Sequence, residues 1–212
     1  VMSDKTELKR AKHKGVEDIN EIYAMLDATT IGTLSWAEDN QPFSIPIAYV
    51  RAGDRLLFHG STGAGALRKL ASGAPCCFSS FVLDGYVLAR SAFESSMHYR
   101  SVVAFGTCTA LEGDAKIDAM NLITEGLFPE RTATLRPMQD KEVAATLILA
   151  LPLDDVSAKW SHSQPKDADE DVSWPVWAGI VPIHHVLGEP VAADNLDPDF
   201  SRPPEYISRW TR

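Results

Sequence analysis

A short glycine-rich segment carries the residues best suited to hold a ligand. Residues 60–65 read Gly-Ser-Thr-Gly-Ala-Gly and follow an apolar, strand-like run that ends at Phe58. The first N–H groups of a helix have no partner inside the helix, and glycines let an anion approach that backbone closely. Ser61 and Thr62 add hydroxyl donors, and the Arg68 guanidinium could hold two phosphate oxygens at once. The segment predicts a phosphate site, and a ligand-free strand-to-helix turn is the alternative.

Neither of the two standard phosphate motifs fits this segment. Gly60 and Gly65 have the spacing of a nucleotide-hydrolysing P-loop, but Ala66-Leu67 stands where Lys-Ser/Thr is required. Gly63-Ala64-Gly65 begins a dinucleotide fingerprint, but Arg68 occupies the position of its last glycine. A phosphate bound here would therefore belong to a different fold.

Three further side chains could take part in chemistry. His59 lies between the strand-like run and the glycines, where an imidazole could polarise a substrate or donate a proton. A hydrogen-bonded structural histidine is the alternative. Arg90 and Arg100 lie in apolar, strand-like surroundings, where a buried guanidinium needs an anionic partner. That partner is either a ligand phosphate or a carboxylate of the protein itself.

The composition limits the class of protein. The chain has 212 residues, 45% of them hydrophobic and 23% charged, which is typical of a globular domain with a proper core. A formal net charge of −9 argues against binding nucleic acid or anionic membranes. No apolar run is long enough to span a membrane, and the charged N-terminal region lacks a signal-peptide core.

The cysteines and histidines suggest reduced thiols and no metal site. An odd count of three cysteines favours free thiols and a cytoplasmic location. Cys76 and Cys77 are neighbours in a strand-like run and should face opposite sides of it, so they make a poor ligand pair. His184-His185 is too sparse for a zinc site.

The surrounding pattern predicts a mainly β protein with inserted helices, whose short strands and frequent turns favour a closed or nearly closed barrel. Phe43, Ile45, Ile47 and Tyr49 alternate with polar residues, as in a strand with one buried face. Pro46 within it predicts a sheet edge, a bulge or a ligand contact. The other expected strands cover 31–36, 55–58, 75–83, 86–92, 100–111, 146–153, 156–160 and 176–183.

Helices are expected over 17–28, from 65 to a stop at Gly73, and over 114–127 with Asp114 as N-cap. Asp84-Gly85 is a strong hairpin signal. We expect a flexible arm over 1–15, one barrel domain over 16–188, and a proline-rich tail without regular structure over 189–212.

Five stretches of the sequence, in their order along the chain, resemble the pyridoxamine 5′-phosphate oxidase-like FMN-binding split barrels, and most closely the nitroimidazole-resistance-type flavoproteins. The resemblance covers about residues 10–185. The matching stretches are Pro-Phe-Ser-Ile-Pro-Ile-Ala-Tyr at 42–49, Leu-Phe-His-Gly-Ser-Thr-Gly at 57–63, Asp-Gly-Tyr-Val-Leu-Ala-Arg-Ser-Ala-Phe at 84–93, Tyr-Arg-Ser-Val-Val-Ala-Phe-Gly at 99–106 and Val-Trp-Ala-Gly at 176–179.

The resemblance implies an FMN-bound homodimer with the flavin at the subunit interface. Ile45, Pro46 and Ile47 would line the flavin ring, and the segment His59, Gly60, Ser61, Thr62 and Gly63 would follow its ribityl phosphate chain. Arg68 would replace the phosphate-binding cation of the family. Arg100, Ser101 and Val102 would lie near the ring or its chain, Trp177 would reach across the dimer, and His59 would face the flavin as the catalytic residue.

The expected function is that of a flavoprotein oxidoreductase. FMN would accept electrons from a reduced nicotinamide or another donor and pass them to a small acceptor such as a nitro compound. A non-catalytic flavin- or haem-binding protein is the alternative, and a deazaflavin-binding relative would be expected to carry more basic residues. The oxidase proper carries Arg-Lys where this chain has Gly65-Ala66, and its C-terminal Arg-His set is missing. These departures argue against activity on pyridoxamine phosphate.

Overall fold

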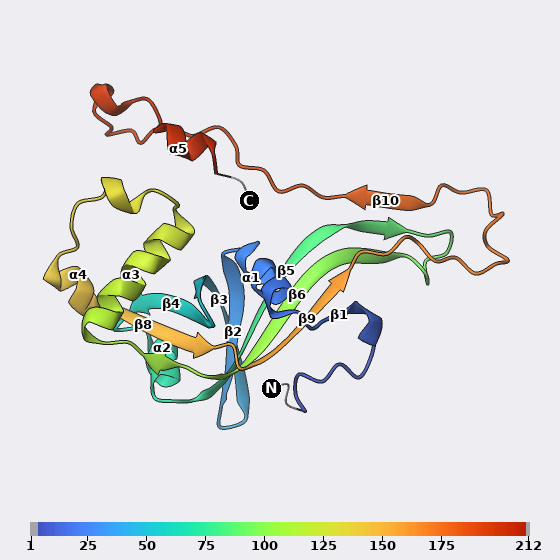
Figure 1. Cartoon of the computed structure of the whole chain (residues 1–212), viewed down its shortest axis with the longest axis horizontal. Coiled ribbons are helices and arrows are strands. Elements are labelled where there is room, and N and C mark those ends of the chain that lie inside the picture. Colours follow the sequence, from blue (N-terminus) through green and yellow to red (C-terminus); the bar gives the residue numbers. More distant parts are fainter. Residues whose placement is uncertain (1–3, 211–212) are drawn as a thin grey trace.

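The computed structural model describes residues 4–210 as one curled antiparallel sheet with helices packed around it (Figure 1). Its ten strands are β1 (Gly15–Val16), β2 (Ile31–Glu38), β3 (Gln41–Ala52), β4 (Arg55–Ser61), β5 (Pro75–Leu88), β6 (Ser96–Thr107), β7 (Thr109–Ala110), β8 (Thr146–Pro152), β9 (Asp155–Ser161) and β10 (Gly179–Pro182). The helices are α1 (Ile19–Asp27), α2 (Gly65–Ala71), α3 (Gly113–Leu127), α4 (Asp140–Ala145) and α5 (Glu205–Ser208), with 3-10 turns η1 (Lys12–Lys14), η2 (Thr132–Thr134) and η3 (Pro198–Phe200).

The order of the strands makes the split barrel. Neighbours follow the path β1-β9-β6-β5-β2-β3-β4-β8-β7, and β10 pairs with β5 away from that path. The sheet curls so that one face encloses the core, while its two ends, β1 and β7, do not pair with each other. The predicted class, mainly β with inserted helices arranged as a split barrel, is confirmed.

The inner face of the sheet holds the main core. Tyr49, Phe58 and Phe78 are at most 1% exposed, and Phe78 packs against both other rings, at centroid distances of 4.7 and 5.6 Å. The Tyr49 hydroxyl donates a hydrogen bond to the Leu26 carbonyl oxygen at 2.6 Å, which ties α1 to the barrel. Because the hydroxyl is desolvated, the pKa of Tyr49 is raised to about 12.

A second apolar layer lies outside the barrel, where α3 covers the outer face of β3, β4 and β8. Leu57 and Ile148 of the sheet pack there against Ile123 and Leu127 of the helix. Gly126 permits this close approach, because a Cβ at that position would lie 2.5 Å from Val50 Cγ1. The alternation of β4 therefore sends Phe58 into the barrel and Leu57 toward α3.

Pro46 costs the sheet no hydrogen bond. The Tyr49 N–H donates to the Thr30 carbonyl oxygen, so alternate positions of β3 point their N–H groups toward β2, and Pro46 is not one of them. On the opposite side, β4 pairs only with Tyr49–Ala52. The missing donor therefore faces an open stretch of sheet edge, one of the three predicted explanations.

The predicted hairpin at Asp84-Gly85 is wrong, because β5 continues through this dipeptide to Leu88. The register with β6 shifts between Leu83 and Gly85, so Asp84 is the extra residue of a bulge. The turn itself lies at 89–95, and β5 and β6 form a long arm that carries β10 on its edge (Figure 1).

Several ends of elements also differ from the expectations. Glu112, not Asp114, is the N-cap of α3, and Asp114 lies inside its first turn, where a carboxylate still favours the helix dipole. The α2 helix ends as expected, with Gly73 at φ +88° just after the C-cap. The tail is not wholly irregular, since η3 and α5 lie within it. Residues 1–3 and 211–212, the outermost parts of the expected arm and tail, lie outside the described residues.

Two parts of the chain near its ends pack on the body of the protein. Thr6, within the predicted arm, is 1% exposed and donates a hydrogen bond to Asp155 at 2.6 Å. In the tail, Tyr206 and Arg209 contact the loop after α3, through hydrogen bonds with Arg131 and Glu130. No helix within residues 4–210 is both long and apolar enough to cross a membrane.

Candidate functional site

His59 points out of the barrel, toward α3. In β4 it follows Leu57 by two positions, so the two side chains leave the strand on the same face. Leu57 is buried under α3, whereas His59 lies beyond the end of that packed layer and is exposed. The strand therefore presents an imidazole at the edge of the outer apolar layer.

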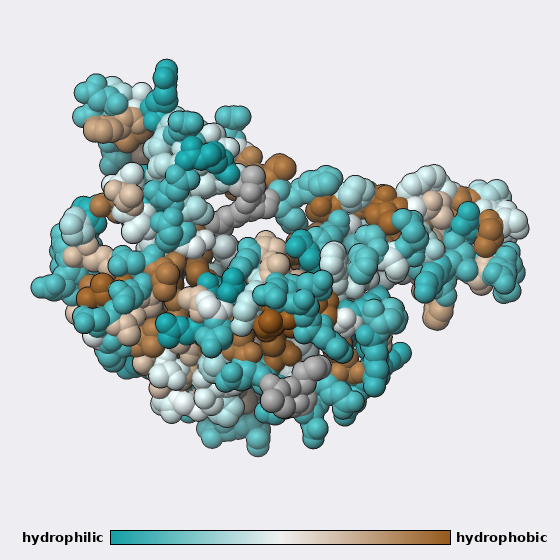
Figure 2. All heavy atoms as spheres, viewed as in Figure 1, coloured by the Kyte–Doolittle hydropathy of each residue, from teal (hydrophilic) through white to brown (hydrophobic). Residues whose placement is uncertain are grey.

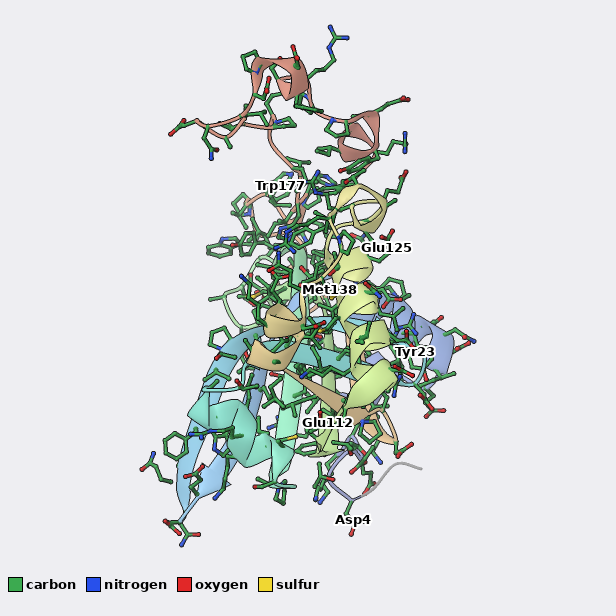
Figure 3. All side chains as sticks on the ribbon, turned by 90° about the vertical axis from the view of Figure 1, so that its left-hand side faces the viewer. Asp4, Tyr23, Glu112, Glu125, Met138 and Trp177 are labelled. Carbon is green, nitrogen blue, oxygen red and sulfur yellow. The ribbon has the colours of Figure 1, made fainter. Side chains whose placement is uncertain are left out.

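A cavity of about 760 Å³ opens in front of this imidazole. Its floor is the outer face of the sheet at Ala48 and Ile148, its side is α3, and its outer wall is the loop that leads to α4. Figure 3 shows this side of the molecule, with Met138 beside helix α3. The lining comprises Ala48, His59, Met120, Asn121, Ile123, Thr124, Leu127, Phe128, Thr132, Leu135, Arg136, Pro137, Met138, Glu142, Thr146 and Ile148. The space is mostly apolar, with an imidazole, a guanidinium and a few hydroxyls at defined points.

The Arg136 guanidinium is held at the rim of the cavity by Glu142. Nη1 of Arg136 lies 3.0 Å from a Glu142 carboxylate oxygen, and Nη2 contacts the other oxygen. Glu142 also accepts from the Gln139 N–H at 2.9 Å and so caps α4. Nη1 of Arg136 also donates to the Pro137 carbonyl oxygen at 3.0 Å. Together these hydrogen bonds fix the guanidinium in one orientation, and the N–H groups that remain can meet a ligand anion.

The carboxylate of Glu142 is expected to titrate at unusually low pH. Hydrogen bonds from Arg136, and then from the Gln139 N–H, lower the pKa of Glu142 from 4.5 to about 2. A lowered pKa means that the pair stabilises the fold above pH 4.5 and loses that effect as the pH falls through about 2. Carbon-detected NMR titration should show this value, and Arg136→Gln should move it back toward 4.5. Lys141→Gln is the matched control, and an equal shift in both variants would contradict the pairing.

One hydroxyl in the cavity wall has no good partner. Thr132 Oγ1 is buried and makes no hydrogen bond of normal geometry within the described residues, although it lies near enough to Glu125 to help lower the pKa of that carboxylate. A ligand in the cavity could satisfy this group.

The predicted phosphate segment is a tight turn between β4 and α2. Three of its backbone donors are already used within the protein: Thr62 N–H bonds the Ala145 carbonyl, and the N–H groups of Gly63 and Ala64 bond Ser61. Gly60 packs its backbone against the Leu67 side chain. The Arg68 side chain is exposed and makes no hydrogen bond or ion pair with the rest of residues 4–210. Arg68 is thus available to an anion, while most of the turn holds itself together.

The predicted flavin-ring segment splits between two faces of β3. Ile45 and Ile47 pack against the inner core, whereas Pro46 is exposed on the outer face. By strand alternation, Pro46 lies on the same outer face as Ala48 and His59, beside the cavity. Pro46 is therefore the residue of this segment that presents a surface to a ligand, next to Ala48 of the cavity lining.

Arg100 and Arg90 are both paired with carboxylates of the protein. Arg100 holds Asp84 through two hydrogen bonds of 2.9 and 2.7 Å, made possible by the bulge that turns Asp84 toward it. This pairing raises the pKa of Arg100. Arg90 donates to Asp167 from its backbone and from its guanidinium, and the backbone hydrogen bond is the main reason that the pKa of Asp167 is lowered. The sequence left open whether each arginine pairs with a ligand phosphate or with a carboxylate of the protein. In the structure, both pair with a carboxylate of the protein.

The remaining predicted residues lie elsewhere on the sheet. Val102 is 1% exposed and belongs to the inner core, and Ser101 is half-buried beside it in β6, which pairs here with β5 on one side and β9 on the other. Trp177 is 64% exposed and packs on Gly179, at the start of β10 (Figure 3). Both sites lie on the β5–β6–β10 arm and not in the cavity.

Sequence reasoning missed the outer wall of the cavity. Arg136, Met138 and Glu142 lie between the expected helix over 114–127 and the expected strand over 146–153, where we predicted no site residue, and Thr132 lies near the beginning of this stretch. The signal available was the loop's length together with Gln-Asp-Lys-Glu at 139–142, a capping box that starts a helix. Nothing in the local pattern showed that this loop faces His59.

Comparison with known proteins places the chain in a family. Residues 18–160 match the family model described as pyridoxamine 5′-phosphate oxidase. The structure of the FAD and haem binding protein from Mycobacterium smegmatis is 40% identical, with a TM-score of 0.90 over 93% of this chain and 97% of that one. The flavocytochrome Anf3 from Azotobacter vinelandii is 32% identical, with a TM-score of 0.91 over 99% and 97% of the two chains.

A more distant structure shares the fold alone. A putative 5-nitroimidazole antibiotic resistance protein from Bacteroides thetaiotaomicron is 18% identical, with a TM-score of 0.58 over 68% of this chain and 85% of that one. Among curated proteins, none is similar enough to count as a match. Because the matched family model covers well over half of the sequence and the strands form the split barrel, the chain belongs to the pyridoxamine 5′-phosphate oxidase family.

Proposed function

We propose that this protein is a redox protein that binds a flavin and a haem. The observation that supports this most directly is the apolar cavity of about 760 Å³ with the imidazole of His59 at its edge. Two relatives that are 40% and 32% identical over almost the whole chain are described as an FAD and haem binding protein and as a flavocytochrome. The sequence predicted a flavin in its main interpretation and a haem only in the alternative; here the two cofactors are proposed together.

The residues of the cavity suit a haem. A neutral imidazole is a common axial ligand of haem iron, and His59 is the histidine among the lining residues. Apolar walls from Ile123, Leu127 and Ile148 would exclude water from the macrocycle. The oriented guanidinium of Arg136 is suited to pair with a propionate carboxylate. Bound there, haem would supply a one-electron iron couple.

The flavin is proposed to lie beside the haem cavity, on the outer face of the sheet near Pro46. Arg68, whose side chain has no protein partner within residues 4–210, is the cation proposed for its phosphate. FAD is favoured over the FMN of the sequence-based expectation, because the 40% identical relative is described as binding FAD. Since Pro46 and His59 share one face, a flavin against Pro46 would lie close to the iron site.

The activity proposed is electron transfer from a reduced nicotinamide or another donor to a small acceptor, such as a nitro compound. A cytoplasmic location remains part of the proposal, in keeping with three free thiols. A non-catalytic carrier or sensor of the same cofactors is the second candidate, favoured by the three backbone N–H donors of residues 62–64, which are already used within the protein. Rapid reduction of bound flavin by NADH or NADPH, followed by reoxidation by a nitro compound, would favour the enzyme.

A homodimer is also proposed, with the β5–β6–β10 arm as its contact surface. Phe81, Leu88 and Val181 on the arm are 73%, 41% and 42% exposed, and hydrophobic residues are visible along it in Figure 2. An exposed apolar arm of this kind is typical of a subunit interface. Light scattering of the purified protein should give twice the mass of 23.2 kDa.

The direct test is the absorption spectrum of the purified chain, reconstituted with haem and with FAD or FMN. Binding of haem should give a sharpened Soret band, and binding of flavin should quench its fluorescence. Chromatography of the cofactors released by denaturation distinguishes FAD from FMN. Spectra equal to the sum of free cofactors and protein would contradict the proposal.

Arg68→Ala is expected to weaken flavin affinity by about tenfold, since a charge-assisted contact with phosphate contributes about 1.5 kcal/mol or more. Lys69→Ala is the matched control, because Lys69 is the next residue of α2 and makes only a 3.9 Å contact with Glu38. Fluorescence titration with FAD measures both variants. Equal affinities for the wild type and Arg68→Ala would move the phosphate to another site.

A further inference from the structure

Two cysteines from distant parts of the sequence face each other inside the barrel. The Sγ atoms of Cys76 and Cys108 lie 3.8 Å apart, although the residues are 32 positions apart in the chain. Both side chains belong to the inner core and are 6% and 4% exposed. Cys76 is in β5, opposite Gly106 of β6, and Cys108 is the single residue between β6 and β7.

A groove gives small molecules access to one of the two thiols. A cavity of about 760 Å³, distinct from that at His59, opens between the start of β5, the end of β6 and the β8–β9 connection. Cys76 and its neighbour Cys77 are both part of its lining, and Cys108 is not. Of the two paired cysteines, Cys76 is therefore the one that a small reagent in the groove would reach first.

The two thiols also differ in their pKa values. The hydrogen bond from Cys108 lowers the pKa of Cys76, while that hydrogen bond and burial raise the pKa of Cys108. Cys76 is thus the better nucleophile, because the thiolate is the reactive form. The third thiol, Cys77, points to the other face of β5, and its pKa is raised by burial.

We propose that Cys76 and Cys108 are a redox-active dithiol that forms an intramolecular disulfide with a low-molecular-weight disulfide as oxidant. The Cys76 thiolate attacks one sulfur of the small disulfide, forming a mixed disulfide and releasing one small thiol. The Cys108 thiolate then attacks Sγ of Cys76, which forms the Cys76–Cys108 bond and releases the second small thiol. Two protein thiols are oxidised, the small disulfide is reduced, and the two thiol protons leave on its products.

The local structure can accommodate the new bond. To form the bond, the two sulfur atoms must approach from 3.8 Å to about 2.05 Å. Rotation of the two side chains can bring them closer together. Cys108 lies outside the regular ladders, at the point where the chain leaves β6 to pair with β8 through β7. The bridge would therefore join the two parts of the curled sheet where the chain passes from one to the other.

The test uses the full chain, reduced and then incubated with oxidised glutathione at pH 8. The expected product has lost about 2 Da, and only one of its three thiols reacts with a thiol reagent after denaturation. Peptide mapping should recover the Cys76 peptide linked to the Cys108 peptide. The thermal midpoint should rise by about 5 °C and fall again after dithiothreitol, because the bridge restricts the unfolded chain.

Three variants identify the roles of the sulfurs. Cys77→Ser is the matched control and should still lose about 2 Da. Cys108→Ala should instead gain one glutathionyl group at Cys76, because no second thiol can displace it. Cys76→Ala should take up glutathione slowly or not at all at Cys108. A linkage that includes Cys77, or no loss of mass in Cys77→Ser, would overturn the proposal, and circular dichroism confirms that each variant is folded.

Discussion

Replacement of His59 by alanine is expected to abolish stable haem binding, with a loss of affinity of at least about 100-fold. His59 is the imidazole that lines the cavity, and in the proposed haem site its bond to the iron would be a main contribution of the protein to binding. Titration of the reconstituted protein with haem, followed at the Soret band, measures the change. Added imidazole should restore part of the Soret shift in this variant, because it can enter the space left by the side chain.

His98→Ala is the matched control for this experiment. His98 lies on the β5–β6 arm and contacts the Ser163 carbonyl oxygen at 2.9 Å, in a different pocket from His59. Its removal should leave haem affinity within about twofold of the wild type, which is under 0.5 kcal/mol. If His98→Ala loses haem and His59→Ala keeps it, the haem site belongs on the arm and not under α3. Flavin binding by His59→Ala shows that any loss is specific to haem.

Phe78→Ala is expected to destabilise the fold by about 3–5 kcal/mol, because a large buried side chain is replaced by a cavity. Phe78 is fully buried where β5 pairs with β2, and its ring contacts both Tyr49 and Phe58. The loss should appear as a lower urea midpoint at an unchanged slope.

Phe93→Ala serves as the comparison for Phe78→Ala. Phe93 is 91% exposed in the turn of the arm, so its removal should change the free energy of unfolding by less than about 0.5 kcal/mol. Similar losses in the two variants would mean that stability depends on the arm, through an interface between subunits, as much as on the inner core. Measurement at two protein concentrations separates these cases, since only an interface makes stability depend on concentration.

Local patterns were enough to predict most of the elements. The alternation of apolar residues over 43–49 and 146–153 predicted β3 and β8, and the spacing of Ile19, Ile22 and Leu26 predicted α1. The dipeptide Asp84-Gly85 misled us, because pairing of β5 with β6 and β10 on both sides outweighs a local preference for a turn. The extra residue was absorbed as a bulge, and the bulge aims Asp84 at Arg100.

Residue types and their order thus predicted the split-barrel fold and the family, because the alternation of apolar residues and the order of the motifs can be read directly along the chain. Only the tertiary structure decided which face each candidate occupies. A shift of one residue along a strand exchanges core for surface, so Val102 lies inside while Ser101 beside it is half-exposed. The cavity at His59 needs α3 and the loop around Arg136, both distant in sequence, to fold over β4. Contacts between residues so far apart in the sequence depend on how the whole chain packs, so a short sequence pattern cannot predict them.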